Sequence, residues 1–316
     1  MVSAKKSLLK RILITIISIL LIFSLISMVA TKIIYDSVFS RTDNTVIVPA
    51  ALEQIVNDRT LVNYPCGDNI LSGYLYKSGK DGTNNTLLIL APGFNAGADS
   101  YLPQIRAFLD MGYSVFAFDP TGSFASQGKS AVGFSQEIFD LEATLEYVES
   151  ENRFGYNSIV LFGHSRGGYA ACCAARGEYD ISAVISVSGI NSAMEAIMGS
   201  SVSYAGNIAY LNYGFLWLYQ AMLFGADTVN LSVDDVINES DVPVLIIHGE
   251  QDAQVPMNRF SIISHRDDIE GDNVHYYICS DKSSNGHTNL LFDEDGTAND
   301  KLFAHINSFL VNSVLN

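Results

Sequence analysis

Positively charged residues are scarce in this sequence of 316 residues. Lysine and arginine together number 18 against 34 aspartates and glutamates, which gives a formal net charge of −16. Four of the basic residues lie before residue 12, so the rest of the chain carries 14 basic and 34 acidic residues, a net charge of −20. The chain after residue 11 is therefore too acidic to offer the cationic surface that binds a phosphate backbone, which excludes nucleic-acid binding as a function class. An anionic lipid surface would also repel it.

Cysteine is scarce as well, with only Cys66, Cys172, Cys173 and Cys279. None of the four lies in a CxxC or in any other metal-ligand spacing, so neither a zinc site nor another bound metal is predicted. Cys172 and Cys173 fall in the apolar helical run 169–175, which indicates buried free thiols. A disulfide between Cys66 and Cys279 is an open alternative if the domain lies outside the cytosol.

One long hydrophobic run is present, and it lies near the amino terminus. Ile12 to Ala30 are nineteen uncharged residues, which at about 1.5 Å per residue nearly cross a bilayer core. Four basic residues precede the run and favour a cytoplasmic amino terminus. They are Lys5, Lys6, Lys10 and Arg11. The sequence therefore predicts a cytoplasmic basic tail at 1–11, a transmembrane signal anchor at 12–30, and a single-pass cell-membrane protein whose folded domain is extracytoplasmic.

A cleaved signal peptide is the alternative to this anchor, and it would make the protein a secreted one. The run is longer than the hydrophobic segment of about 7–15 residues that is usual for cleaved signals. The cleavage candidate Met28-Val29-Ala30 has a bulky residue where a small one is expected. These features favour the anchor. Residues 31–59, mixed and polar, are predicted to form a stalk or a pre-domain helix.

From residue 60 to residue 316 the chain alternates short β-rich runs with helical patterns, which is typical of a mostly parallel sheet covered by helices. Eight strands are predicted, of which the first two form a hairpin. They are 61–64, 70–77, 87–91, 114–119, 158–162, 183–188, 244–248 and 274–279. The predicted helices of the alternation are 101–111, 134–150, 166–176, 257–269 and 298–314. We therefore expect an α/β domain with an eight-stranded sheet.

The alternation breaks at residues 190–240, between two predicted strands. This stretch holds seven aromatic residues. An aromatic insertion of this kind is predicted to be an α-helical cap over a pocket, although rings that pack on one another in a helical subdomain fit the same pattern.

The sharpest motif is Gly163-His164-Ser165-Arg166-Gly167, a G-x-S-x-G between an apolar strand and an alanine-rich helix. A strand-to-helix turn this tight forces its central residue into strained backbone geometry, and the flanking glycines remove Cβ atoms that would clash. The turn places the Ser165 hydroxyl at a helix N-terminus, where free N–H groups favour developing negative charge. Ser165 is therefore the predicted nucleophile.

Two downstream loops supply the partners that a serine nucleophile needs. A serine hydroxyl is weakly nucleophilic at neutral pH, so it requires a base, and the base requires an acid to orient it. Asp252 follows the predicted strand 244–248, and His287 follows the strand 274–279. Because the carboxyl ends of parallel strands meet at one edge of a sheet, both side chains are expected on the rim that carries Ser165.

Glu250 lies in the same loop as Asp252 and is the alternative acid. The remaining histidines are interpreted as structural or surface residues. They are His164, His248, His265, His275 and His305. Among them, His164 is expected to point off the nucleophile turn, and His248 to pack near the acid loop.

A negatively charged intermediate needs two preset N–H donors. The backbone N–H of Arg166, directly after the nucleophile, is the first predicted donor. The second is expected in the loop after strand 87–91, where Phe94 is the candidate.

Together these residues resemble the α/β-hydrolase superfamily over residues 60–314, and its subgroup similar to serine aminopeptidases, monoacylglycerol lipases and Bem46-like hydrolases. The superfamily often has His-Gly after its third strand, where this chain has Pro92-Gly93-Phe94. Its Asp-x-Arg-Gly-x-Gly-x-Ser loop after the fourth strand corresponds here to 119–130, which is longer and lacks the arginine. The resemblance implies hydrolysis of an ester, thioester or amide.

The predicted function is hydrolysis of a carboxylic ester or thioester through an acyl-Ser165 intermediate, with a small-molecule or lipid-like acyl compound as substrate and no organic cofactor or metal. Two alternatives stay open. One is an extracytoplasmic serine peptidase or amidase, and the other is a surface binding protein that keeps the fold without the chemistry. The sequence does not determine an oligomeric state.

Overall fold

Eight strands form one sheet in this computed structural model, which describes residues 2–79, 85–150, 154–177 and 179–314. The strands are β1 (Thr60–Cys66), β2 (Asn69–Tyr76), β3 (Thr86–Ala91), β4 (Ser114–Asp119), β5 (Ser158–His164), β6 (Ile181–Val187), β7 (Val244–Gly249) and β8 (Val274–Cys279). Their order is β1-β2-β4-β3-β5-β6-β7-β8. The β1–β2 hairpin and the β2–β4 pair are antiparallel, and the other pairs are parallel. The predicted sheet of eight mostly parallel strands is confirmed.

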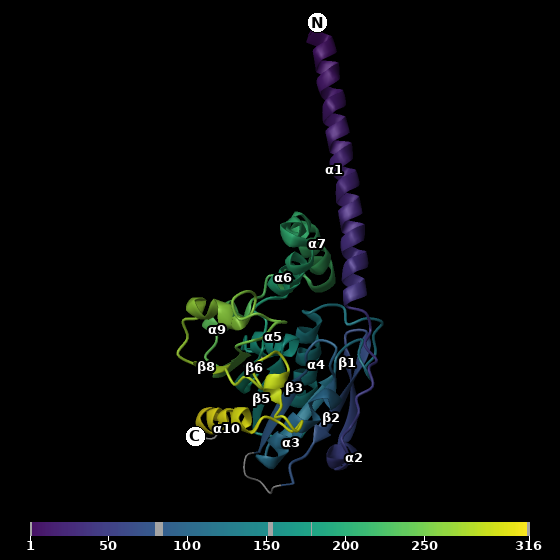
Figure 1. Cartoon of the computed structure of the whole chain (residues 1–316). Helices are drawn as coiled ribbons and strands as arrows, with labels where there is room; N and C mark the ends of the chain where they lie inside the picture. Colours follow the sequence, from purple (N-terminus) through teal and green to yellow (C-terminus); the bar gives the residue numbers. More distant parts are fainter. Residues whose placement is uncertain (1, 80–84, 151–153, 178, 315–316) are drawn as a thin grey trace.

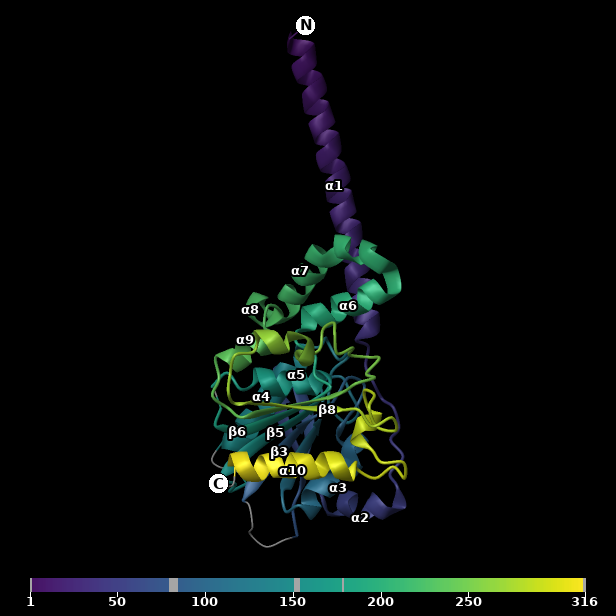
Figure 2. The same ribbon diagram turned by 60° about the vertical axis from the view of Figure 1, so that its left-hand side comes forward.

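Helices cover both faces of the sheet (Figures 1 and 2). On one face lie α4 (Gln136–Glu149) and α5 (Arg166–Cys173), and on the other lie α3 (Leu102–Asp110) and α10 (Asp300–Val314). Alternate side chains of β3 show why its sequence is apolar from Leu87 onward. Leu87 and Ile89 join the core under α4 and α5, whereas Leu88 and Leu90 join the core under α3 and α10.

The four cysteines are buried free thiols, as predicted for Cys172 and Cys173. The alternative of a disulfide between Cys66 and Cys279 is wrong. These residues end β1 and β8, which are the two outer strands of the sheet, so the other six strands separate them.

The predicted helix at 257–269 is also wrong, since only a short 3-10 helix, η5 (Ile262–Asp268), is present there. The backbone before it is used in other pairings. The carbonyl of Phe260 accepts from the N–H of Asn191 (2.9 Å), and the N–H of Ile262 donates to the carbonyl of Gly189 (3.1 Å). Long-range pairing of this kind competes with the local helix and is not visible in the apolar spacing.

Four helices form the inserted cap within 190–240. They are α6 (Ala193–Ala205), α7 (Tyr213–Phe224), α8 (Ala226–Val229) and α9 (Val233–Asn238), with the 3-10 helix η4 (Gly206–Asn212) between α6 and α7. The described residues also form the shorter 3-10 helices η1 (Ala50–Leu52), η2 (Ala98–Tyr101) and η6 (Asn289–Leu291).

The amino-terminal helix α1 spans Val2–Val38 and projects away from the domain beside α7 (Figure 1). Among the helices that the structure describes, α1 alone is long and apolar enough to cross a membrane, a property that a signal sequence shares. Its last turn is not free, because Tyr35 is buried against Tyr219 of the cap, and Phe39, directly after the helix, is buried against Phe94 and Phe134. The helix therefore continues past the predicted boundary at residue 30 and docks on the domain.

The segment after α1 is held against the domain by hydrogen bonds. Arg41 donates to the carbonyls of Phe124, Ser126 and Gly128, and the hydroxyl of Thr42 donates to the Asn95 side chain at 2.7 Å. The rest of the segment 31–59 is an extended stretch followed by η1 and the short helix α2 (Glu53–Asp58).

Candidate active site

Ser165 stands alone between the last residue of β5 and the first residue of α5. Its φ of 56° and ψ of −118° are strained for a residue with a side chain, as predicted for the turn. The N–H of Ser165 donates to the carbonyl of Val187 (2.7 Å), which fixes the turn to the end of β6. A Cβ atom at Gly163 would meet the carbonyl of Gly167, and a Cβ at Gly167 would meet the carbonyl of Ala91. Both glycines are therefore required by close backbone approach.

The predicted base and acid are in direct contact. The Nδ1 of His287 lies 2.7 Å from an Asp252 carboxylate oxygen, and both side chains are buried. The second carboxylate oxygen of Asp252 accepts from the N–H groups of Gln254 (2.9 Å) and Val255 (2.8 Å). Burial alone would raise the pKa of Asp252, but the hydrogen bond from His287 outweighs it with help from the backbone N–H, and the pKa lies below its ordinary value. The pair therefore presents an ionised acid behind an imidazole whose Nε2 is left for chemistry.

The alternative acid, Glu250, is exposed and forms no such contact in the described chain. His248 is fully buried, donates from Nε2 to the carbonyl of Val255 (2.8 Å), and lies 3.4 Å from the carboxylate of Asp252. It packs near the acid loop, as predicted, and helps to hold that loop.

His164 connects the parts of the site, a role that the sequence did not indicate. Its Nε2 donates to the backbone carbonyl of His287 (2.9 Å), and its Nδ1 accepts from the hydroxyl of Tyr101 (2.8 Å). That hydroxyl in turn accepts from the N–H of Gly93 (2.9 Å). One chain of hydrogen bonds thus joins the loop of the predicted second donor, the nucleophile turn and the base loop. The sequence predicted that the His164 side chain points off the turn, but it did not predict the hydrogen-bond partners of that side chain.

Burial also fixes the protonation state of His164, because it lowers the pKa of the imidazole to about 3. The folded protein keeps the ring neutral, while the unfolded chain protonates it as the pH falls through its ordinary value of 6.5. His164 therefore contributes stability in full above about pH 6.5, and this contribution is lost as the pH falls from 6.5 towards about 3.

We expect His164→Gln to remove this part of the pH dependence, because glutamine takes up no proton. The melting-temperature difference between wild type and variant should be largest above pH 6.5 and should shrink at lower pH. Thermal unfolding at a series of pH values measures this difference. The matched control is His275→Gln, at an exposed histidine of β8. Parallel curves for wild type and His164→Gln would contradict the assignment.

The two predicted N–H donors come from the loop after β3 and from the first residue of α5. Within the described part of the chain, the backbone N–H groups of Phe94 and Arg166 have no protein acceptor, as a site for a bound oxyanion requires. The Phe94 ring is half-buried and packs edge-on against Phe39 (5.3 Å) and Phe134 (5.7 Å). The end of α1 therefore contacts the loop of the second donor.

The side chain of Arg166 is buried beside Phe94 and paired with Glu137 of α4. The guanidinium lies 5.6 Å from the Phe94 ring centre and 2.7 Å from the Glu137 carboxylate, and both members of the pair are at most 2% exposed. The angles of this contact are not those of a hydrogen bond, so its attraction is chiefly coulombic. Burial raises the pKa of Glu137 to about 8, although Arg166 opposes the rise.

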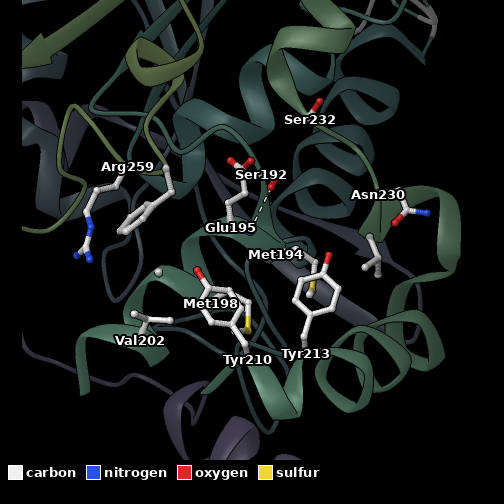
Figure 3. Close-up of a pocket in the computed structure, with 13 residues that line it drawn as sticks. Ser192, Met194, Glu195, Met198, Val202, Tyr210, Tyr213, Asn230, Ser232 and Arg259 are labelled. Carbon is white, nitrogen blue, oxygen red and sulfur yellow. Dashed lines mark hydrogen bonds between the residues drawn. The ribbon is translucent and has the colours of Figure 1, made fainter. Parts of the chain in front are cut away.

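A cavity of about 560 Å³ lies between the cap and residues 259–260 of the domain (Figure 3). Its wall mixes polar and apolar side chains, and Glu195 and Arg259 add one charge of each sign. The apolar wall includes Met194, Met198, Val202, Tyr210, Tyr213 and Phe260. None of Ser165, Asp252 and His287 lines it, so the cavity belongs to the cap rather than to the nucleophile.

The described residues offer one group with ligand atoms close enough for a metal ion, namely Asp234, His265 and Asp268. Its ligand atoms lie within 4.8 Å of one another. His265 also contacts Glu195 at 3.2 Å, so the cluster reads equally as an ion-pair network at the surface. It lies outside the nucleophile turn and contributes nothing to it.

Known proteins with related sequences include two polyketide transferases and a lipase. A family model described as alpha/beta hydrolase fold matches residues 86–212. A polyketide transferase of Gibberella fujikuroi is 31% identical over 122 residues, which are 37% of this chain and 37% of the relative. The lysophosphatidylserine lipase ABHD12 of Danio rerio is 24% identical over 192 residues, 60% of this chain and 46% of the relative. The matched part is thus less than half the length of either relative.

Solved structures resemble a larger part of the chain. An esterase of Pyrococcus furiosus matches with a TM-score of 0.65 and 18% identity, over 87% of this chain and 98% of the esterase. Est1E of Butyrivibrio proteoclasticus with bound ferulic acid matches with a TM-score of 0.60 and 17% identity, over 81% of this chain and all of the other. At this level of identity the likeness shows the fold alone.

Proposed function

Because this chain belongs to the α/β-hydrolase superfamily, we propose that it is a membrane-anchored serine hydrolase that cleaves carboxylic esters or thioesters. The observation that carries the proposal is the 2.7 Å contact between His287 and Asp252. The carbonyl of His287 is held by His164, the residue directly before Ser165. The rings of His164 and His287 lie 4.9 Å apart, so the base loop stands beside the nucleophile turn.

In the proposed reaction, the Ser165 hydroxyl attacks the carbonyl carbon of the substrate while Nε2 of His287 takes its proton. The N–H groups of Arg166 and Phe94 donate to the oxygen that becomes negative. The leaving group departs with the proton held by His287, which leaves an acyl-Ser165 ester. A water molecule then gives a proton to His287 and attacks this ester, and His287 returns the proton to the departing Ser165 oxygen, which releases the acid and restores Ser165. Asp252 holds His287 in the required tautomer and stabilises its charged form.

The domain organisation proposed for this function follows the sequence. Residues 1–11 form a cytoplasmic tail, α1 crosses the membrane over 12–30, and residues 60–316 form the hydrolase domain outside the cytoplasm. Basic residues before the apolar run and the length of α1 support this arrangement.

Transfer of the acyl group to an alcohol or amine instead of water is a second candidate function. Two matched relatives are polyketide transferases, which favours it. The same acyl-Ser165 intermediate serves both reactions, and only the acceptor differs. Addition of small alcohols during turnover should yield new esters if the acyl group is transferred, and only free acid if water is the acceptor.

The proposed function is tested with ester and amide substrates that share one acyl group, and with a fluorophosphonate probe that captures activated serines. We expect the full-length protein to hydrolyse the ester faster than the amide and to be labelled by the probe. His287→Ala should label at least about 10³-fold more slowly, because the hydroxyl loses its base. Faster amide cleavage would favour a peptidase, and a folded wild type that is neither labelled nor active would favour a binding protein.

A further inference from the structure

The cap packs along α1 at several levels. The Phe215 ring of α7 lies edge-on to Phe23 at 6.1 Å, and the Tyr219 hydroxyl donates to Asp36 at 2.6 Å. Between them, Asn212 donates to the hydroxyl of Thr31 at 2.7 Å. The cap is therefore fixed to α1 from Phe23 to Asp36, and Figures 1 and 2 both show α7 beside the helix.

The depth of Phe23 decides where the cap lies if α1 crosses a membrane. Arg11 is the last charged residue before the apolar run and would stay at the cytoplasmic edge. Phe23 lies twelve residues further along, about 18 Å of helix, in a hydrocarbon core of about 30 Å. Phe23 and its neighbour Phe215 would then lie about 12 Å inside the outer edge of that core.

The composition of the cap fits such a position. Glu195 and Asp227 bound a stretch, residues 196–226, that contains no charged residue, although the body of the chain is strongly acidic. This stretch exposes large apolar and aromatic side chains from α6, η4 and α7. They are Tyr204, Ile208, Tyr210, Leu211, Tyr213, Leu218, Met222 and Leu223. Exposed apolar side chains gathered on neighbouring helices mark an interaction surface, and tyrosines among aliphatic residues are typical of a membrane interface.

We propose that the uncharged stretch 196–226, hereafter the cap face, is seated in the outer lipid layer and that the substrate enters from the bilayer. The second part rests on the proposed hydrolase function and names its substrate class, an acyl ester dissolved in the membrane. Tyr210 and Tyr213 belong both to the cap face and to the wall of the cap cavity. The seating would therefore bring two residues of the cavity wall into contact with lipid.

Trp217 is the single tryptophan of the chain and lies half-buried in α7, so its fluorescence reports on the cap alone. The full-length protein is reconstituted in vesicles of phosphatidylcholine brominated near the headgroup end of one acyl chain, because bromine quenches a nearby indole. We expect strong quenching of Trp217. The double variant Ile208→Lys with Leu211→Lys should reduce the quenching by about half or more, because two charges disfavour insertion. Ile47→Lys, at a residue that is 88% exposed outside the cap, is the matched control.

The same variants separate the seating of the cap from the chemistry. The double variant should hydrolyse a long-chain ester dissolved in the bilayer about tenfold more slowly than wild type, and a short water-soluble ester at an unchanged rate. Equal loss on both esters, or no loss on either, overturns entry from the bilayer.

Absent quenching in wild type, or equal quenching in the double variant, overturns the seating. If Trp217 is unquenched while wild type is dimeric and the variant monomeric, a second copy covers the cap face and the proposal is wrong. Quenching as expected without any ester hydrolysis supports the seating and contradicts the proposed function instead.

Discussion

Ser165→Ala is expected to lower ester turnover by at least about 10⁴-fold, the largest effect of any single substitution considered, while the fold is kept. The covalent intermediate cannot form without the hydroxyl, and only substrate binding and the two N–H donors would then favour hydrolysis. Alanine occupies the strained backbone at φ 56° no worse than serine does, so stability should change little. Steady-state kinetics and thermal unfolding of the same preparation measure both quantities.

Asp252→Asn is the control that distinguishes a triad from a lone serine. Asparagine keeps the size of the side chain but presents a neutral amide to His287, which removes the preference for the reactive tautomer. A turnover loss approaching that of Ser165→Ala is expected, with little change in substrate affinity. Undiminished turnover in Ser165→Ala would refute the assignment of the nucleophile, and a normal rate in Asp252→Asn would refute the assignment of the acid.

The second large effect is expected on stability, at the buried pair of Arg166 and Glu137. Glu137→Leu leaves the guanidinium of Arg166 without a counter-charge in a place that is closed to water. Breaking a buried ion pair on one side typically costs about 3–5 kcal/mol of unfolding free energy. The measurement is denaturant unfolding at pH 9, because the Glu137 pKa of about 8 leaves the carboxyl largely ionised there.

Two further variants test this explanation. Adding Arg166→Met to Glu137→Leu should recover most of the lost stability, since both charges are then gone. Glu142→Leu removes the partner of the more exposed Arg176 and should cost at most about 1 kcal/mol. A loss in Glu137→Leu as small as that in Glu142→Leu would mean that the buried pair contributes no more than a surface one.

The sequence was most informative where short-range geometry determines the structure. A strand, two glycines and a helix leave few conformations for Ser165, and the turn has the predicted strain. Asp252 and His287 could be predicted to meet because both follow parallel strands, whose carboxyl ends share one edge.

Prediction was weakest where distant segments compete for the same backbone or side chain. The apolar spacing at 257–269 fits a helix, yet pairing with residues 189–191 takes up the backbone just before it. The role of His164 depends on Tyr101 and on a carbonyl 123 residues away, which no local pattern encodes. The docking of Tyr35 on the cap and of Phe39 on Phe94 is equally long-range, and composition alone suggested a stalk or a pre-domain helix.

If α1 crosses a bilayer as proposed, the junction after α1 has a mechanical consequence. Phe39 packs on Phe94, and Arg41 and Thr42 form hydrogen bonds with neighbouring loops of the domain. No flexible linker therefore separates the helix from the domain. A helix that is joined rigidly to a domain transmits its tilt to that domain, and the tilt depends on the thickness of the surrounding membrane. A thinner or thicker bilayer would therefore rotate the whole domain and strain the Phe94 loop, so that turnover becomes sensitive to lipid chain length even for a substrate that is unchanged.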